Sequence, residues 1–341
     1  MEKQGNLYKG EAMEEKLRLY FLNNGYFVAR SVKYFFEDNE ITDIDLFLYG
    51  RSSSLSRERI NVDIKNKKNP KAFERILWTK GLQQLLGFDK CAVATTDKRE
   101  TIRRYGLKNN TIILDGNFLQ KLSYNTEQRL NEEDILDAFS HLKSYKVYRN
   151  QTWKYIYEKS KSRILNELDY SGFNSSLLSL EYFLLKCFDK QKIETAYRAT
   201  LIFLSHSLLI LDYVMKDIAF LEPQLREETL SNGFRYGNLG REGVNRTIDM
   251  AVQMTNSTIS ANEIKKSLET NKTDIFKEYF SKVENIKSVF KWSVELESLG
   301  FQKKLLNPNN LPPELKGTLA IFLDYFEIKR KDYFKLFEKI K

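Results

Sequence analysis

Apolar residues near the start of the chain recur at helical spacing. Four of them share one face of a helix expected over residues 11–23: Met13, Leu17, Tyr20 and Phe21. Gly25 follows the segment and suits the left-handed residue that ends many helices. The pattern therefore predicts an amphipathic first helix.

The next segments change to the composition of β-strands. Residues 26–36 and 41–49 are rich in β-branched and aromatic side chains, and the polar residues 37–40 between them are typical of a hairpin turn. A serine-rich loop over 51–59 leads to a third strand, 60–65. We expect three consecutive strands after the first helix.

Helix and strand signals then alternate. We expect a helix over 71–86 closed by Gly87, a strand over 91–96, a helix over 98–105 and a strand over 111–115. The predicted order is α, β, β, β, α, β, α, β, which is typical of an α/β domain with a mixed sheet.

From about residue 131 onward the apolar spacing is helical throughout, which predicts an all-α C-terminal domain. We place the boundary between residues 122 and 123 and expect residues 1–122 to fold without the helical part. Residues 1–122 carry 22 Lys and Arg against 16 Asp and Glu, a net +6, and the remainder carries 33 against 30, a net +3. The excess positive charge is concentrated in the α/β domain.

Composition narrows the possible chemistry. The 341 residues carry a formal net charge of +9, which suits a polyanionic partner. Two Cys and two His exclude clustered Cys/His zinc sites and a histidine-rich nuclease site. The longest apolar run, residues 199–211, is shorter than the roughly 18 residues of a membrane span, and no signal peptide is evident. We expect a soluble cytoplasmic protein with no membrane partner.

Acidic side chains share faces of two neighbouring strands. Side chains alternate along a strand, so Asp43 and Asp45 point one way, as do Asp63 and Lys65 in the third strand. If the two strands pair, the carboxylates of Asp45 and Asp63 converge. Such an oxygen-rich site suits Mg²⁺, with Mn²⁺ able to substitute, and an adjacent lysine can activate water and stabilise developing negative charge.

The first helix offers a third carboxylate. At 100° per residue, Glu14 borders the buried face, whereas Glu15 is expected to point to solvent. Glu14 is therefore the residue that we expect to assist the site.

These residues, in this order of elements, resemble the PD-(D/E)XK nuclease superfamily, whose restriction-endonuclease-like core runs αβββαβ. The resemblance covers roughly residues 8–122. It lies in the helix with Glu14, in Asp43-Ile44-Asp45 and in Asp63-Ile64-Lys65. The segment 111–116, followed by Leu119, is similar to the end of methyl-directed restriction endonuclease and Holliday-junction-resolvase-like domains. No proline precedes Asp45, and Asp63 stands where glutamate is commoner.

The resemblance implies a metal-dependent endonuclease in which Asp45, Asp63 and the Ile64 carbonyl bind the metal, Lys65 attends the water and Glu14 assists. It also implies DNA as the favoured substrate over RNA and, by analogy, a role in restriction or anti-phage defence. The helical domain would then select substrate, bind a partner protein or form a homodimer.

Further residues have both a functional and a structural interpretation. We expect Phe73, Ile76 and Leu77 to form the buried face of the helix over 71–86, with Lys80 and Gln84 on that face supporting the site together with Asp43, or simply satisfied locally. A set of basic residues flanks the site as candidate phosphate contacts or as plain solvated surface: Arg51, Arg57, Arg59, Lys67, Lys68 and Lys71.

Two other functions stay open. Asp43, Asp45, Asp63 and Lys65 can be solvated strand residues, in a catalytically silent nucleic-acid-binding or scaffolding protein of the same fold. An RNA-cleaving toxin acting through the helical domain is less favoured, because Arg198 and His206 are eight residues apart, wider than in HEPN ribonucleases.

Overall fold

The computed structural model describes residues 3–4, 7–37, 39–123, 128–142, 151–255, 260–269 and 272–338. Its contacts divide the chain into two compact units. Unit 1 comprises Met1–Asn166 with Phe301–Lys304, and unit 2 comprises Glu167–Gly300 with Leu305–Lys341. The described residues change from mixed to helical elements near the expected boundary at 122/123, but the contacts group the next two helices with the sheet.

Unit 1 contains a five-stranded mixed sheet and a separate two-stranded sheet, β1-β2. The elements of unit 1 are β1 (Lys3–Gln4), β2 (Leu7–Tyr8), α1 (Lys9–Asn23), β3 (Phe27–Phe36), β4 (Asn39–Arg51), β5 (Arg57–Lys65), α2 (Ala72–Leu86), β6 (Lys90–Thr95), α3 (Glu100–Lys108), β7 (Thr111–Leu114), α4 (Gly116–Lys121), α5 (Glu132–Ser140) and α6 (Trp153–Asn166). The strand order is β3-β4-β5-β6-β7, antiparallel from β3 to β5 and parallel from β5 to β7. The predicted α/β class, element order and mixed sheet are confirmed.

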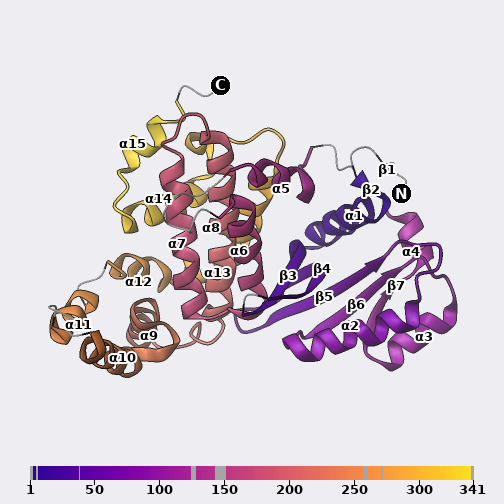
Figure 1. Cartoon of the computed structure of the whole chain (residues 1–341), viewed down its shortest axis with the longest axis horizontal. Coiled ribbons are helices and arrows are strands. Elements are labelled where there is room, and N and C mark those ends of the chain that lie inside the picture. The colour runs from indigo at the N-terminus through magenta and orange to yellow at the C-terminus, as the bar shows by residue number, and fades with distance from the viewer. Residues whose placement is uncertain are drawn as a thin grey trace. The chain divides into compact units, whose positions relative to one another are not determined.

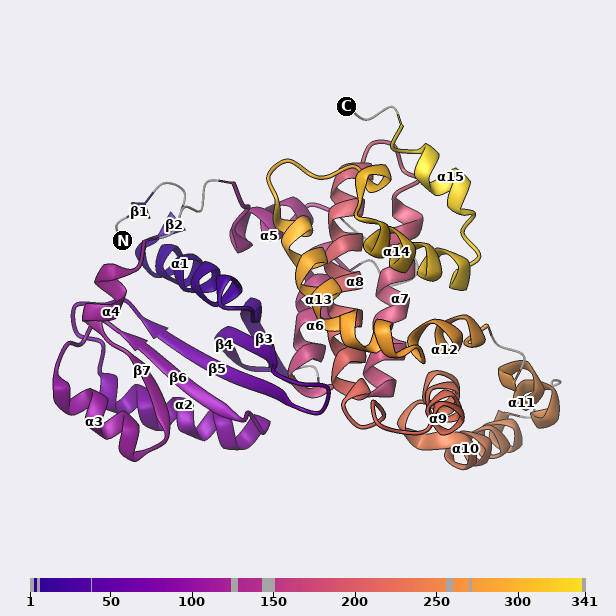
Figure 2. The same cartoon turned by 180° about the vertical axis from the view of Figure 1, so that it is seen from behind.

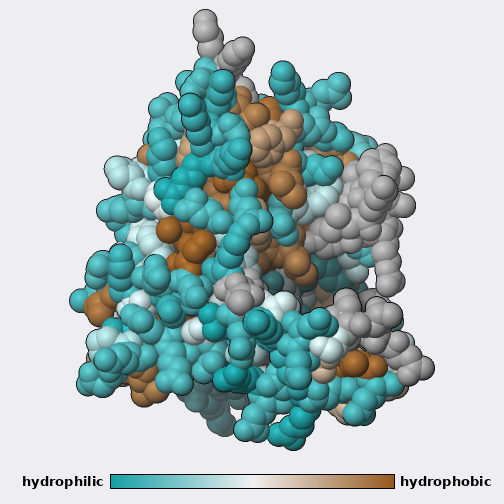
Figure 3. All heavy atoms as spheres, turned by 90° about the vertical axis from the view of Figure 1, so that its left-hand side faces the viewer, coloured by the Kyte–Doolittle hydropathy of each residue, from teal (hydrophilic) through white to brown (hydrophobic). Residues whose placement is uncertain are grey.

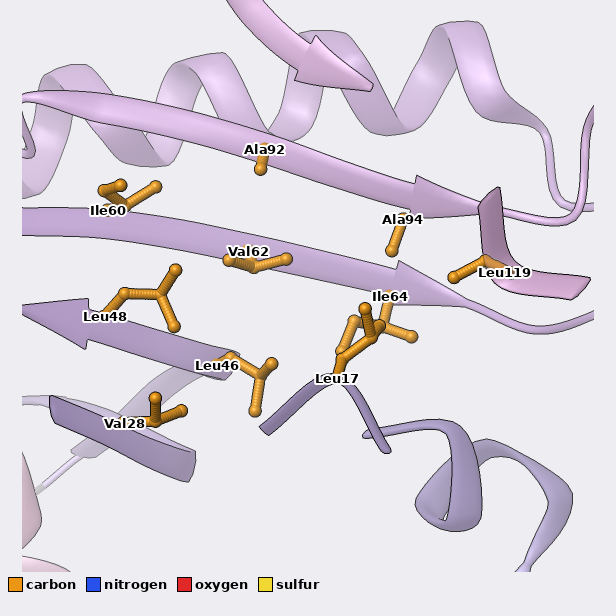
Figure 4. Packing of buried hydrophobic residues seen from close by; sticks show 10 residues of the cluster. All are labelled: Leu17, Val28, Leu46, Leu48, Ile60, Val62, Ile64, Ala92, Ala94 and Leu119. Atoms are coloured by element: carbon orange, nitrogen blue, oxygen red, sulfur yellow. The ribbon is translucent and has the colours of Figure 1, made fainter. Parts of the chain in front are cut away.

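Helices cover both faces of this sheet, with α1 on one side and α2 and α3 on the other (Figures 1 and 2). On the α1 side, a cluster that includes Leu17, Val62 and Ile64 fills the space between helix and strands (Figure 4). On the other side Ile76 and Val93 belong to a smaller apolar cluster. Because Val62 and Ile64 face α1, the residues between and after them face α2.

A buried ion network joins α1 and β3 to α5 and α6 within unit 1. Its members are Glu14, Glu15, Arg18, Arg30, Glu132, Glu133 and Lys161. Arg30 pairs with Glu15 at 2.9 Å and with Glu133 at 2.7 Å, and Lys161 pairs with Glu132. Glu15 is buried and accepts a hydrogen bond from Arg30, so the expectation that it points to solvent is wrong.

Unit 2 is built from helices, which confirms the predicted all-α second part. They are α7 (Tyr170–Lys186), α8 (Ile193–Met215), α9 (Pro223–Tyr236), η1 (Gly237–Leu239), α10 (Gly240–Thr255), α11 (Ala261–Glu269), α12 (Asp274–Phe280), α13 (Val283–Phe301, whose last residue belongs to unit 1), η2 (Pro308–Asn310), α14 (Pro313–Tyr325) and α15 (Arg330–Lys335). One face seen in Figure 3 is mainly hydrophilic, with separate hydrophobic patches.

By length and composition alone, α8 is the one helix among the described residues that could cross a membrane. It is almost entirely buried inside the protein, as core helices of soluble proteins are. This is weak evidence for a membrane span, and the expected cytoplasmic location stays a prediction.

Candidate functional site

The candidate site begins where β4 and β5 part. Their pairing ends with Leu46 opposite Val62, and Asp45 and Asp63 come next on the two strands. The Ile64 amide donates a hydrogen bond of 2.6 Å to Asp45 Oδ2, so a side chain takes over from the backbone ladder. The amide and the carbonyl of one strand residue point toward the same neighbouring strand, so the Ile64 carbonyl also faces the side of β4 on which Asp45 lies.

Lys65 lies between the two carboxylates. Its Nζ is 3.4 Å from Asp45 Oδ2 and 3.6 Å from Asp63 Oδ1. The three side chains are mostly buried, with exposed fractions of 24% for Lys65, 15% for Asp45 and 9% for Asp63. The structure thus brings together the two expected acids and the lysine at the end of a strand pair.

Arg75 is a fourth member of the site, which was not expected from the sequence. Its Nε donates to Asp63 Oδ2 at 2.9 Å, and its Nη2 donates to Oδ1 of the same carboxylate. Such two-point pairing is the strong geometry of arginine with carboxylates. We call Asp45, Asp63, Lys65 and Arg75 the Asp-Lys-Arg cluster.

Packing of α2 fixes the position of Arg75. The buried residues of the helix include Ile76 and Thr79, and the side chain of Asn61 on β5 donates to the Thr79 carbonyl at 3.1 Å. Arg75 lies directly before Ile76, so its side chain emerges at the edge of the contact with the sheet. A helical wheel with Ile76 and Thr79 on the buried face would have indicated that Arg75 lies at the edge of this contact.

The buried face of α2 expected from the sequence is wrong. Phe73 and Leu77 are exposed, because the helix turns Thr79 and Leu82 toward the sheet with Ile76. Gln84 is exposed, and the half-buried Lys80 donates to Gln83 Oε1 at 2.8 Å. Neither residue reaches the Asp-Lys-Arg cluster through a described contact. Asp43 is exposed on β4, two residues before Asp45.

Burial and crowded charge act on Asp45. Burial raises its pKa above the usual value, Lys65 opposes this by lowering it, and the nearby Asp63 raises it further. The hydrogen bond from the Ile64 amide also lowers the pKa. An additional cation here would therefore favour the ionised form of Asp45.

Glu14 lies near the site but has another partner. Its Oε2 accepts a hydrogen bond of 2.6 Å from Arg30 Nε, within the buried ion network. The pKa of Glu14 is raised from 4.5 to about 7, mainly because the carboxyl is buried; Arg30 opposes the rise, and Asp45 adds to it. The charges of Glu14 and Asp45 thus influence each other, although the structure pairs Glu14 with Arg30 on the α1 side.

Three of the expected phosphate contacts lie at the wrong end of the sheet. Arg57 and Lys65 stand at opposite ends of β5, and steps of about 3.3 Å put them roughly 26 Å apart. Arg57 donates to the carbonyls of Ser53, Ser54 and Ser56 and holds its own loop together. Arg51 and Arg59 belong to the same end, so the expectation that these arginines flank the site is wrong.

Three lysines remain beside the site. Lys67 and Lys68 follow Lys65 on an exposed loop, and Lys71 is the exposed residue directly before α2. Lys71 pairs with Glu74 at 3.2 Å. These lysines are the candidate phosphate contacts that the structure leaves in place.

The donor set fits a hard divalent cation only in part. Asp45, Asp63 and the Ile64 carbonyl supply oxygen atoms, and Mg²⁺ is often held by one or two carboxylates plus phosphate oxygens. Against this, Arg75 and Lys65 neutralise both carboxylates. Among the residues that the structure describes, no group of three or more His, Cys, Asp or Glu side chains is arranged to hold a metal ion.

Comparisons of the chain with protein-family models, with curated proteins and with solved structures give no significant match. The functional assignment therefore depends on the geometry of the Asp-Lys-Arg cluster.

Proposed function

We propose that the protein is a metal-dependent endonuclease that hydrolyses phosphodiester bonds, with DNA the favoured substrate. The observation that carries the proposal is the position of Lys65 between Asp45 and Asp63 at the end of the β4–β5 pairing. Two acids and a lysine on one face of adjacent strands can supply metal ligands and a charge-stabilising donor for metal-assisted hydrolysis of a phosphodiester.

Each residue has a distinct task in this proposal. Asp45, Asp63 and the Ile64 carbonyl would hold Mg²⁺ or Mn²⁺, which supplies positive charge to the phosphate when bound. Lys65 would orient the attacking water and stabilise negative charge that develops on the phosphate. Lys67 and Lys68 would hold the backbone of the substrate.

The direct test is a cleavage assay with purified protein on supercoiled, linear, single-stranded and branched DNA and on RNA, with Mg²⁺, Mn²⁺ or EDTA. Lys65→Ala should lower turnover by about 100-fold or more, the scale seen when one charge-stabilising donor is removed. Asp63→Asn should also weaken Mn²⁺ binding. Lys68→Ala is the matched control, because losing one exposed phosphate contact should weaken binding and leave turnover nearly unchanged.

A second function, nucleic-acid binding without catalysis, is favoured by one observation. Arg75 and Lys65 already compensate the charges of Asp63 and Asp45, so the cluster is stable as a set of ion pairs. In that case the wild type binds nucleic acid with a steep loss at rising salt but cleaves none of the substrates with any metal. Cleavage that Lys65→Ala leaves unchanged would instead refute the site assignment.

A further inference from the structure

Trp78 is an exposed aromatic residue on α2, close to the Asp-Lys-Arg cluster. The chain contains three tryptophans. Trp153 and Trp292 are buried, whereas Trp78 is 49% exposed. Burying a tryptophan ring is normally favourable, so a half-exposed indole beside a candidate site raises the question of what covers it.

The geometry connects this indole to the site through one guanidinium group. Arg75 Cζ lies 5.9 Å from the centroid of the Trp78 ring. The same guanidinium makes the two-point contact with Asp63. Residues three apart in a helix are surface neighbours, so Arg75 and Trp78 occupy the same flank of α2.

The helix that carries both residues is held firmly against the sheet. Ile76 and Thr79, which directly follow Arg75 and Trp78, are fully buried. Thr79 Oγ1 donates to the Arg75 carbonyl at 2.7 Å, and the Thr79 carbonyl accepts from Asn61. The indole is therefore presented from a fixed backbone, which lowers the entropic cost of stacking a ligand on it.

Charge complementarity identifies the kind of ligand. The exposed lysines Lys67, Lys68 and Lys71 precede α2, and the cation of Arg75 lies beside the ring. An aromatic surface next to cations is the arrangement that binds single-stranded nucleic acid, in which bases stack on the ring and phosphates meet the charges. A base inside a duplex is already stacked and cannot offer its face.

We propose that Trp78 stacks on an unpaired base of the substrate, while Arg75 turns from Asp63 to an adjacent phosphate. The preferred substrate then contains at least one unstacked nucleotide beside the cleaved bond, as in single strands, flaps or junctions. This inference rests on the proposed nuclease function, because the bond to be cleaved, and with it the unpaired base, is located relative to the proposed metal ligand Asp63.

Intrinsic fluorescence of the full chain tests the contact without cleavage. In EDTA, a single-stranded oligothymidylate should quench the emission of the wild type, because Trp78 is the exposed tryptophan. A blunt duplex of equal length should quench it much less. Equal quenching by both, or none by the single strand, would overturn the proposal.

Substitutions of Trp78 separate the stacking of a base from the fluorescence of the indole. By anisotropy of a labelled single strand, Trp78→Ala should weaken binding by about 5- to 150-fold, the range for losing one base–aromatic stack. Trp78→Phe should bind within about threefold of the wild type while losing most of the quenching signal. Leu85→Ala, which removes another exposed apolar side chain of α2, is the matched control and should change little.

The outcomes keep this inference distinct from the proposed function. Quenching and the Trp78→Ala loss without cleavage under any metal support the stacking surface and refute the nuclease. Efficient cleavage that Trp78→Ala leaves unchanged, together with unchanged single-strand affinity, refutes the stacking surface alone. If Leu85→Ala weakens binding as much as Trp78→Ala, α2 is a nonspecific apolar surface and the proposal fails.

Discussion

Replacing Lys161 by methionine tests whether the buried ion network stabilises unit 1. Lys161 is 1% exposed, and its Nζ bonds the Glu132 carboxylate and the carbonyls of Arg30 and Ser31, at 2.8 and 3.1 Å. Burial tends to raise the pKa of Glu132, but Lys161 and Arg18 bring it below the usual value, so the acid is ionised. Lys161→Met leaves that buried charge with a weaker set of partners.

The cost follows from this set of lost contacts. Removing one partner of a buried ion pair typically costs about 3–5 kcal/mol, because the remaining charge stays desolvated. Arg18 still contacts Glu132 at 3.4 Å and offsets part of the loss, whereas two backbone carbonyls lose their donor. We therefore expect the free energy of opening unit 1 to fall by about 3–5 kcal/mol.

Hydrogen exchange followed by mass spectrometry measures this cost locally, which is necessary because a chain of two units need not unfold in one step. Peptides from α5 and α6 should lose protection, and those from α14 serve as an internal reference. Lys154→Met on the same helix is the control for a half-buried lysine. Adding Glu132→Gln to Lys161→Met should recover at least about 1 kcal/mol, because no unpaired charge is then buried. A loss below about 1 kcal/mol for Lys161→Met, or an equal loss for Lys154→Met, would show that the buried ion network does not stabilise unit 1 through Lys161.

Three further outcomes are expected. The pKa of Glu14 is raised from 4.5 to about 7, so between these pH values the folded unit 1 holds a proton that the unfolded chain releases. The free energy of opening unit 1 should therefore fall by about 3 kcal/mol as pH rises from about 4.5 to 7. In hydrogen exchange of peptides from α1 and β3 at about pH 5 and pH 8, corrected for the intrinsic exchange rates, Glu14→Gln should abolish most of this pH dependence, and an unchanged pH dependence would count against it. Arg75→Met should tighten Mn²⁺ binding in calorimetry without nucleic acid, because Asp63 loses its competing cation; unchanged or weaker binding would contradict this. Residues 1–122 expressed alone should be less protected from proteolysis than residues 1–166, because Arg18 and Arg30 lose Glu132 and Glu133; equal protection would restore the boundary expected from sequence.

The strands, and the positions of the site carboxylates on them, could be predicted from local sequence patterns. Alternation along a strand has a period of two, so the burial of Val62 and Ile64 alone decides that Asp63 and Lys65 face the other way. The register of the β4–β5 pairing, which runs from Arg51 opposite Arg57 to Leu46 opposite Val62, then puts Asp45 and Asp63 next to each other just beyond the last pair. Their catalytic roles stay predictions.

Long-range partners explain what the sequence did not reveal. Glu15 looked solvent-facing from the apolar stripe of α1, yet it is buried because Arg30 and the Glu132 amide satisfy its carboxylate. A partner more than 100 residues away leaves no local periodic signal. The buried face of α2 was missed for a simpler reason, since it includes the polar residue Thr79, whose hydroxyl bonds to the Arg75 carbonyl, and apolar spacing does not indicate a buried threonine.

Arg75 links the two events that the proposed nuclease must combine. Its guanidinium occupies both oxygens of Asp63, so a divalent cation can use that carboxylate fully only if Arg75 moves to another anion. A substrate phosphate is such an anion, and it would arrive beside Trp78. Binding free energies are reciprocal, so nucleic acid should tighten Mn²⁺ binding by the same factor by which Mn²⁺ tightens nucleic-acid binding. Arg75→Met removes the shared group, and the coupling between the two ligands should then fall toward that of simple charge neutralisation.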